Sequence, residues 1–311
     1  MNTSRRKIVL ALTASSLPFS IRAQSYPSKP ITIVVPFVAG GGADAVARMI
    51  ATQLQKTTGQ AVVVDNKPGA GGALAAEAVT RAAADGYTLL IATNSLLTNS
   101  AITKTRYDIQ RDFTAISTLG TSPYLLLSNT SAPFKSVSDI VRMGKSQPDK
   151  LSFGSAGQGS ITHLLGELTK QQAAFTAQHI PYKGTGAALL DLLGGQIDFA
   201  FADTASAMPH LKAGKLRALA TTGPARSPQL NDVPTTREVG LDMSVVGFYG
   251  LLAPAGLSPS VLARLNGDVT AILATNEVKD RFAALLTDAS SMTSDKFTQL
   301  LASEQTLWRD V

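Results

Sequence analysis

The chain contains no cysteine and only three histidines among its 311 residues. Without cysteine it has no disulfide, no thiolate metal site and no cysteine nucleophile, so its stability must come from its core. The histidines, at positions 163, 179 and 210, lack the H-x-x-x-H spacing of common zinc sites. We therefore expect neither a metal nor a redox cofactor.

Catalytic signatures and basic runs are lacking as well. There is no G-x-S-x-G, H-E-x-x-H or phosphate-binding P-loop, and no two carboxylates have a distinctive spacing. Ser155 or Ser160 could imitate a nucleophile beside His163, but no third group is evident to orient the histidine. No run of Lys and Arg indicates a nucleic-acid surface. The sequence favours neither an enzyme nor a nucleic-acid binder.

The N-terminus has the three parts of a secretory signal peptide. Basic residues at positions 5–7 precede an apolar stretch over residues 8–21, and Ala23 supplies the small residue before a cleavage site. The stretch is too short for a permanent membrane anchor. We predict a cleaved signal over residues 1–23, by a twin-arginine or an ordinary export route, and a periplasmic mature protein. That mature chain carries 24 basic and 22 acidic residues, a net charge of +2.

Short apolar runs alternate with longer segments of helical periodicity through most of the chain. This alternation is typical of βα units around parallel sheets and predicts an α/β fold. Two extended runs, at residues 114–128 and 245–253, bracket one βα module. They predict two lobes joined by a two-strand hinge, with the ligand cleft between them. We assign residues 24–122 and 247–311 to lobe 1 and residues 123–246 to lobe 2.

Four glycine-rich turns lie between a strand-like run and a helix-like segment. Their backbone N–H groups can approach an anion closely, and the dipole of the following helix favours negative charge. Repeated turns of this kind in one exported protein suggest a receptor for an anionic ligand. The turns are Val38–Asp44 (VAGGGAD), Lys67–Ala73 (KPGAGGA), Gly154–Ser160 (GSAGQGS) and Lys183–Ala187 (KGTGA).

The first turn leaves alternatives open. Gly40-x-Gly42-x-x-Ala45, with Asp65 ending the next strand, also fits a dinucleotide-binding turn, which would make the chain an exported oxidoreductase. Residues 36–39 separate the strand from the first glycine, however, where the dinucleotide turn normally begins at once. Asp44 can either cap the following helix or face the cleft.

A set of short motifs runs over essentially the whole mature length. With these motifs the chain resembles the tripartite tricarboxylate transporter family of periplasmic solute receptors, also called Bug-type receptors. No single motif is specific, but jointly they are. They include Val35-Pro36-Phe37 with Gly40-Gly41-Gly42 and Asp44, Asn66-x-Pro68-Gly69-Ala70-Gly71-Gly72, Asp85-Gly86-Tyr87, Ser155-x-Gly157-x-Gly159-Ser160 with His163, Pro181-Tyr182-Lys183-Gly184 and Ala253-Pro254-Ala255-Gly256.

The resemblance implies a two-lobed type II periplasmic binding fold that closes over a small organic mono- or dicarboxylate. It also implies a monomer that hands this ligand to the permease subunits of a tripartite membrane transporter, with no metal or cofactor. In such receptors backbone amides, hydroxyls and ordered waters hold the carboxylates. Carried over, the binding residues are Phe37, Gly41, Gly42, Ala43 and Asp44 in lobe 1 and Ser155, Gly159 and Ser160 in lobe 2, with Lys183 and Asp203 as further pocket members and Asn94 and Ser95, in the loop after the third strand, as a selectivity element.

Two positions depart from the family pattern. Phe248-Tyr249 stands where relatives usually have tryptophan, so the rim of the pocket is expected to differ in shape. The Asp-Asn pair of the family appears here as Asp203-Thr204, which puts readout by an amide at that point in doubt.

Overall fold

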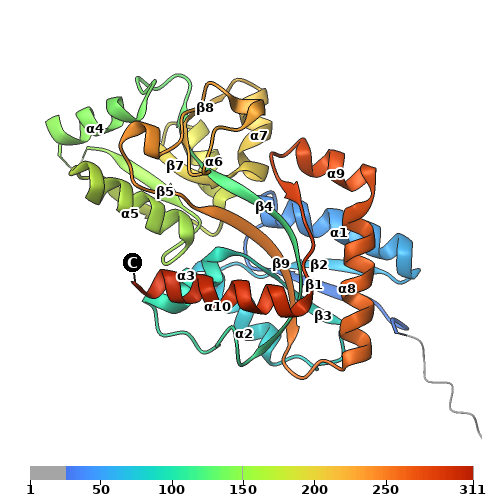
Figure 1. Cartoon of the computed structure of the whole chain (residues 1–311). Coiled ribbons are helices and arrows are strands. Elements are labelled where there is room, and N and C mark those ends of the chain that lie inside the picture. The colour runs from blue at the N-terminus through green and yellow to red at the C-terminus, as the bar shows by residue number, and fades with distance from the viewer. Residues whose placement is uncertain (1–25, 149, 311) are drawn as a thin grey trace, which may run out of the picture.

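The computed structural model of the protein describes residues 26–148 and 150–310, so the predicted signal peptide lies outside the described residues. Within them the strands run in the order β2-β1-β3-β9-β4-β7-β5-β6, and β8 and β10 also pair with β4. Helices pack on this sheet and form two lobes around it (Figure 1). The α/β fold predicted from the alternation is confirmed.

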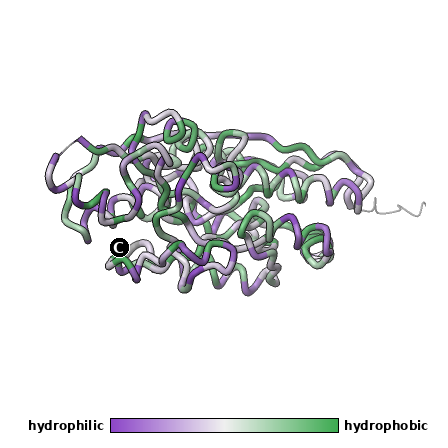
Figure 2. The backbone as a smooth tube through the Cα atoms, turned by 90° about the horizontal axis from the view of Figure 1, so that it is seen from above, coloured by the Kyte–Doolittle hydropathy of each residue, from purple (hydrophilic) through white to green (hydrophobic). Residues whose placement is uncertain are grey.

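In lobe 1 the parallel strands β1 and β3 are largely buried, whereas β2, at the edge of the sheet, is partly exposed. Successive strand residues point to opposite faces, and Ile33 and Val34 of β1 accordingly belong to two different hydrophobic clusters. Seen from above, many of the helices show both hydrophobic and hydrophilic stretches, as expected where one face packs on a sheet (Figure 2). The strands of this lobe are β1 (Ile31–Val35), β2 (Val62–Asn66), β3 (Thr88–Ala92) and the short β10 (Asp288–Ala289).

The helices of lobe 1 follow the predicted periodicity with one exception. In the first helix Val46, Ile50 and Leu54, spaced by four, are all fully buried, and Gly59 ends the helix with a left-handed φ of 68°. The described helices of this lobe are α1 (Gly42–Thr58), the 3-10 turn η1 (Ala70–Gly72), α2 (Ala73–Thr80), α3 (Asn94–Ile102), α8 (Pro259–Ala274), α9 (Asn276–Ala283) and α10 (Ser294–Asp310).

The exception is α3, because the segment after β3 was expected to be a loop. Its Asn, Ser and Thr residues have weak helix propensity. Packing provides what propensity does not: Leu96 and Leu97 are buried, and the Tyr107 hydroxyl donates to the Leu96 carbonyl at 2.7 Å. The expectation of a loop was therefore wrong, and the first residues of a helix stand at that position.

Lobe 2 repeats the βα pattern on a smaller scale. Helix α4 begins with a capping box: the Asp139 N–H donates to the Ser136 hydroxyl, and the Ser136 N–H donates to the Asp139 carboxylate. Two short 3-10 turns, η2 (Pro228–Leu230) and η3 (Arg237–Val239), follow the last strand of the lobe. Its other elements are α4 (Val137–Ser146), β5 (Ser152–Ser155), α5 (Ile161–Ala173), β6 (Gln178–Pro181), α6 (Thr185–Leu193), β7 (Phe199–Asp203), α7 (Thr204–Lys212) and β8 (Leu216–Thr221).

Two long strands connect the lobes. β4 (Phe113–Asn129) pairs with β9 (Val246–Pro254) as far as Pro123, and from Tyr124 onward it pairs with β7. Figure 1 shows both strands running between the two lobes. Because a strand continuous across the boundary can flex where its partners change, these two strands are suited to act as a hinge. None of the described helices is long and apolar enough to cross a membrane.

Candidate functional site

A small cavity of about 30 Å³ lies between the lobes, where β4 and β9 pass from one lobe to the other. A space of this size accommodates a water molecule or two. It is lined by Phe37, Gly41, Gly42, Ala43, Thr93, Ser95, Ser122, Tyr124, Ala156, Ile161, Thr162, Thr185, Asp203, Gly247, Phe248 and Tyr249. Of the residues predicted from the sequence, Phe37, Gly41, Gly42, Ala43, Ser95 and Asp203 are among this lining, and the others are not.

The N-termini of five helices converge on the cavity. Residues of the first turn of α1, α3, α5 and α6 line it, and so does Asp203, the N-cap of α7. The first N–H groups of a helix have no partner within it, and the helix dipole is positive at this end. No Lys, Arg or His is among the lining residues. The groups of the lining that can attract an anion are therefore backbone N–H and hydroxyl groups.

The first glycine turn lies against lobe 2. The Gly42 N–H donates to the Ser206 hydroxyl at 2.7 Å, and the Val38 N–H donates to the Lys183 carbonyl at 3.0 Å. A Cβ at Gly42 would lie 1.9 Å from an Asp203 carboxylate oxygen and 2.5 Å from the Tyr249 hydroxyl. Only glycine permits this approach, so the close contact of the two lobes depends on it.

Asp203 is the one acidic side chain in the lining. It caps α7 by accepting from the Ser206 N–H at 2.8 Å, and it also accepts from the hydroxyls of Thr185 and Tyr249, both at 2.9 Å. Burial, and next the charge of Asp203, raise the pKa of Tyr249 well above its ordinary value. Tyr249 is thus a neutral donor at all ordinary pH values, and it ties lobe 1 to Asp203 of lobe 2.

Asp44 is buried behind the first turn and is not among the lining residues. Its carboxylate accepts from the Gly40 N–H at 3.1 Å, the Asn66 amide at 3.0 Å and the Arg48 guanidinium at 2.9 Å. Burial raises the pKa of Asp44, but these hydrogen bonds outweigh it and hold the pKa below its ordinary value. Neither role considered for Asp44 is seen: Asp44 is outside the cavity lining, and α1 begins at the N-cap Gly41 without a side-chain cap. Asp44 instead fixes the turn before the helix by accepting from Gly40.

The serine-glycine turn of lobe 2 does not present its serines to the cavity. Ser155 and Ser160 are fully buried, and Ser160 caps α5 by accepting from the His163 N–H at 3.3 Å. Gly159 adopts a left-handed φ of 76°, and its carbonyl accepts from the Thr98 hydroxyl of lobe 1 at 2.8 Å. The neighbours Ala156, Ile161 and Thr162 line the cavity instead.

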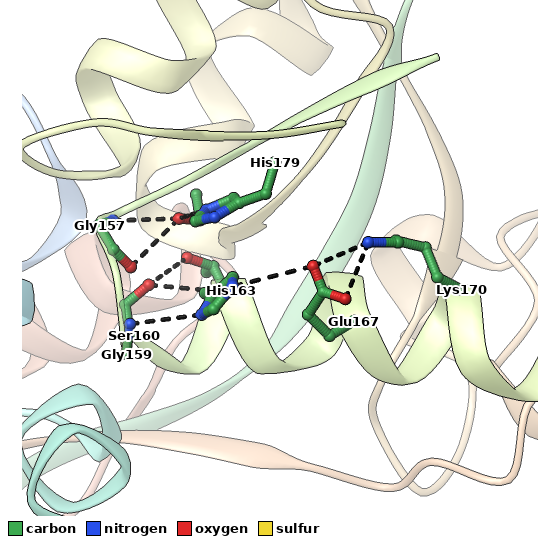
Figure 3. A network of polar contacts seen from close by, with 9 residues as sticks. Gly157, Gly159, Ser160, His163, Glu167, Lys170 and His179 are labelled. Carbon is green, nitrogen blue, oxygen red and sulfur yellow. Dashed lines mark hydrogen bonds and ion pairs between the residues drawn. The ribbon is translucent and has the colours of Figure 1, made fainter. Parts of the chain in front are cut away.

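A histidine network supports this turn from behind (Figure 3). Ser155 Oγ lies 2.7 Å from His179 Nε2, and the His179 and His163 rings stack with 3.9 Å between their centroids. His163 Nδ1 accepts from the Gly159 N–H at 3.3 Å, and its Nε2 faces Glu167 at 3.8 Å. Of the serines considered beside His163, Ser160 does contact it, through the His163 N–H, whereas Ser155 pairs with His179. His179 is brought in by the pairing of β6 with β5.

Burial lowers the pKa of both histidines. For His179, burial and then the adjacent His163 lower the pKa to about 4. For His163, burial again dominates, and the nearby Glu167 counteracts it. Lys170, which pairs with Glu167 at 2.8 Å, adds a further positive charge beside the stack. Both rings are therefore neutral near pH 7 and can act as hydrogen-bonding supports.

The remaining predicted residues lie beside the cavity. Asn94 is fully buried: its oxygen accepts from the Phe248 N–H at 3.0 Å and its amide donates to Glu304 at 2.9 Å. Lys183 is exposed, and only its backbone contacts the first turn. Thr204, in place of the expected Asn, donates to the Leu286 carbonyl at 2.9 Å and is outside the lining.

Sequence reasoning missed several lining residues. Thr185 lies within the fourth glycine turn, but it was not among the predicted binding residues. Tyr249 was noted only as a departure from the family pattern. Thr93 precedes a helix that was not predicted. Ser122 and Tyr124 lie where β4 changes partners, and the Pro123 between them was the only local signal.

The fold is that of a two-lobed binding protein, with a cavity between its lobes. The chain belongs to the tripartite tricarboxylate transporter family of receptors, whose model matches residues 46–311. It is therefore a solute-binding receptor, and the proteins of its family and its structural neighbours are solute-binding proteins of the periplasm.

Individual relatives agree over nearly the whole chain. Protein BugT of Bordetella pertussis is 32% identical, over 100% of this chain and 97% of BugT. The structure of MatC from Rhodopseudomonas palustris with bound malate is similar at a TM-score of 0.88 and 34% identity, covering 92% of this chain and 99% of MatC. An R. palustris protein with adipate also superposes at a TM-score of 0.88, with 30% identity, 92% of this chain covered and 96% of that protein.

Proposed function

We propose that this receptor captures a small organic mono- or dicarboxylate in the cavity between its lobes. The observation that carries the proposal is the convergence of five helix N-termini on one buried cavity whose lining holds no basic side chain. Backbone N–H groups at helix N-termini are a common means of binding anions. The malate and adipate named for two structurally similar proteins fit this chemistry.

Capture proceeds by closure of the hinge. Across the cleft Gly42 donates to Ser206, Tyr249 donates to Asp203, and the Ile161 N–H donates to the Ser95 hydroxyl at 3.3 Å. These contacts hold the lobes together around a cavity smaller than a dicarboxylate, so the lobes must part for a ligand to enter and must close around it with a wider cavity than here. A ligand that bridges donors of both lobes then favours the closed form. The lobes extend over residues 24–122 with 247–311, and over residues 123–246.

The receptor works as a monomer in the periplasm, after removal of residues 1–23, and delivers its ligand to the permease subunits of a tripartite transporter. It binds without turnover. Ser155 and His179 are spaced like a nucleophile and a base, but Ser155 is fully buried and its hydroxyl also bonds within its own turn. The closed form, in which surfaces of both lobes come together, is what the permease recognises.

A thermal-shift screen of the mature protein tests this function. The panel contains malate, succinate, adipate, aromatic carboxylates, amino acids, sugars, NAD and NADP. A ligand that binds only the folded state raises the melting temperature, by an amount that grows with its concentration above Kd. We expect a saturable rise with carboxylates, one ligand per chain by calorimetry, and unchanged ligand by NMR. A rise with a dinucleotide alone, or conversion of the ligand, would contradict the proposal.

A further inference from the structure

Thr93, between β3 and α3, has a buried hydroxyl that the fold leaves without a partner. The residue is 6% exposed, and in the part of the chain that the structure describes its Oγ1 is the only buried side-chain N or O atom with no hydrogen bond. Buried polar atoms in native proteins are nearly always hydrogen-bonded, and leaving one unpaired is destabilising. An unpaired hydroxyl in this place therefore requires an explanation.

The ordinary explanation for such a residue is a helix cap, and Thr93 does not provide one. Thr93 is the N-cap of α3, with φ −140° and ψ 167°, yet its side chain accepts nothing from the helix. Ser136, the N-cap of α4, has nearly the same backbone, with φ −149° and ψ 165°, and its hydroxyl does accept from the Asp139 N–H. The backbone of Thr93 therefore does not prevent capping.

The branched side chain does not prevent capping either. Thr275 caps α9 with its hydroxyl, which accepts from the Val278 N–H at 3.4 Å. Ser160, Asp203 and Ser258 cap α5, α7 and α8 in the same way. Thr93 thus differs from these described N-caps in its hydroxyl, which has no partner. It lines the cavity, as the capping residue Asp203 also does.

The surroundings of Thr93 favour a negatively charged partner. It begins a nine-residue helix whose first N–H groups and dipole attract an anion. Its neighbour Ser95 also lines the cavity. A hydroxyl is a donor to a carboxylate, and such a bond is stronger than one between neutral groups.

We propose that the Thr93 hydroxyl donates a hydrogen bond to a carboxylate oxygen of the bound ligand. This makes Thr93 a specificity-determining residue of the receptor, at the α3 end of the cavity. The proposal rests on the carboxylate-binding function and adds to it a particular side chain. It explains why a position suited to capping keeps its hydroxyl away from the helix.

Three variants measured by calorimetry with malate, succinate and adipate test the proposal. Thr93→Val removes the hydroxyl and keeps the shape, and we expect it to weaken binding about 10- to 100-fold, the usual loss for a hydrogen bond to a charged group. Its melting temperature without ligand should be unchanged or higher, since an unpaired polar atom is removed. Thr93→Ser retains the hydroxyl and should bind within about threefold of the natural protein.

The matched control is Thr169→Val. Thr169 is as deeply buried, but its hydroxyl donates to the Leu165 carbonyl within α5 at 2.7 Å. This variant should melt at a lower temperature and bind with unchanged affinity. Equal affinities for Thr93→Val and the natural protein, or an equal loss in Thr93→Ser, would overturn the role of the hydroxyl alone. If the natural protein binds no carboxylate of the panel, the proposed function itself is wrong, and this inference with it.

Discussion

Two of the glycine-rich turns, one in each lobe, end alike on a helix N-terminus beside the cavity, but different chemistry holds them in place. In lobe 1 a charged network does so, with the buried Asp44 accepting from Gly40, Asn66 and Arg48. In lobe 2 a neutral network does so, in which His179 supports Ser155. One turn depends on a carboxylate that must stay ionised, and the other on imidazoles that must stay neutral.

The difference separates the two turns in their response to acid. A carboxylate whose pKa is lowered by folding stabilises the protein above about pH 3.8 and loses that contribution only at lower pH. A histidine whose pKa is lowered stabilises it above about pH 6.5 and loses that contribution as the pH falls towards 4. On acidification the turn of lobe 2 is therefore expected to loosen first.

The largest effect is expected at the first turn itself. In Gly42→Ala the new methyl carbon would lie 1.9 Å from an Asp203 oxygen, a contact that the closed lobes cannot accommodate. Ligand affinity should fall more than about 100-fold, because only the open arrangement relieves the overlap. The melting temperature without ligand should fall only slightly, because the open arrangement relieves the overlap. Calorimetry with the ligand found by the screen measures the first effect, and a melting curve the second.

Gly267→Ala is the matched control for that variant. Gly267 lies in the middle of α8, is exposed, and a methyl carbon added there would have no neighbour within 4 Å. Replacing an exposed helical glycine by alanine stabilises by roughly 0.5–1 kcal/mol. Affinity should not change. Tight binding by Gly42→Ala would show that the close approach of the first turn to Asp203 is not needed for capture.

Removal of Asp44 tests the charged half of the comparison. Asp44→Ala leaves the Gly40 N–H and the Asn66 amide without their acceptor, which should lower the free energy of unfolding by about 2–3 kcal/mol. Since Asp44 is outside the cavity lining, affinity should fall by less than that of Gly42→Ala. Denaturant melts at pH 7 provide the measurement.

Asp268→Ala serves as the control, because Asp268 forms the same i,i+4 pair with an arginine, at 2.8 Å, on the surface of α8. The Arg264 side chain is 45% exposed and that of Asp268 13%, so this partly exposed pair is expected to contribute on the order of 1 kcal/mol. If both variants lose the same small amount, the acid does not hold the first turn. A loss of affinity without a loss of stability would indicate that Asp44 faces the cleft and contacts the ligand.

Elements of the fold were predictable from the sequence where they depend on local interactions, and not where they depend on packing between separate segments. The helix Gly42–Thr58 was predictable from Val46, Ile50 and Leu54, because amphipathic spacing is a local property. Helix α3 was not, because it forms from weak helix formers that are stabilised by packing against distant residues such as Tyr107. Thr93 was missed for the same reason, since no helix start was expected there.

The site showed the same division. The glycine turns were predicted to bind an anion, and Gly41 and Gly42 of the first turn do line the cavity, as does Asp203. The pairing of Ser155 with His179 joins residues 24 positions apart through the register of β5 with β6, which the sequence does not reveal. Motifs thus identified which loops matter, while contacts between strands determined which side chains support them.

The neutral half of the comparison is tested by His179→Gln, for which the smallest effect is expected. Glutamine can still hydrogen-bond to Ser155 but cannot take up a proton. The natural protein should lose on the order of 1–2 kcal/mol of stability between pH 6.5 and 4, less than a fully buried histidine would give, because the ring is half buried. His163, Glu167 and Lys170 face the same ring, so part of the pH dependence of stability will remain in the variant.

Melting temperatures at pH 7, 6, 5 and 4.5 should fall less steeply in His179→Gln than in the natural protein. The control is His210→Gln, which lies outside the network and should keep most of the slope. An unchanged slope in His179→Gln would mean that the histidine stack does not titrate with folding, and that the two turns respond to acid alike.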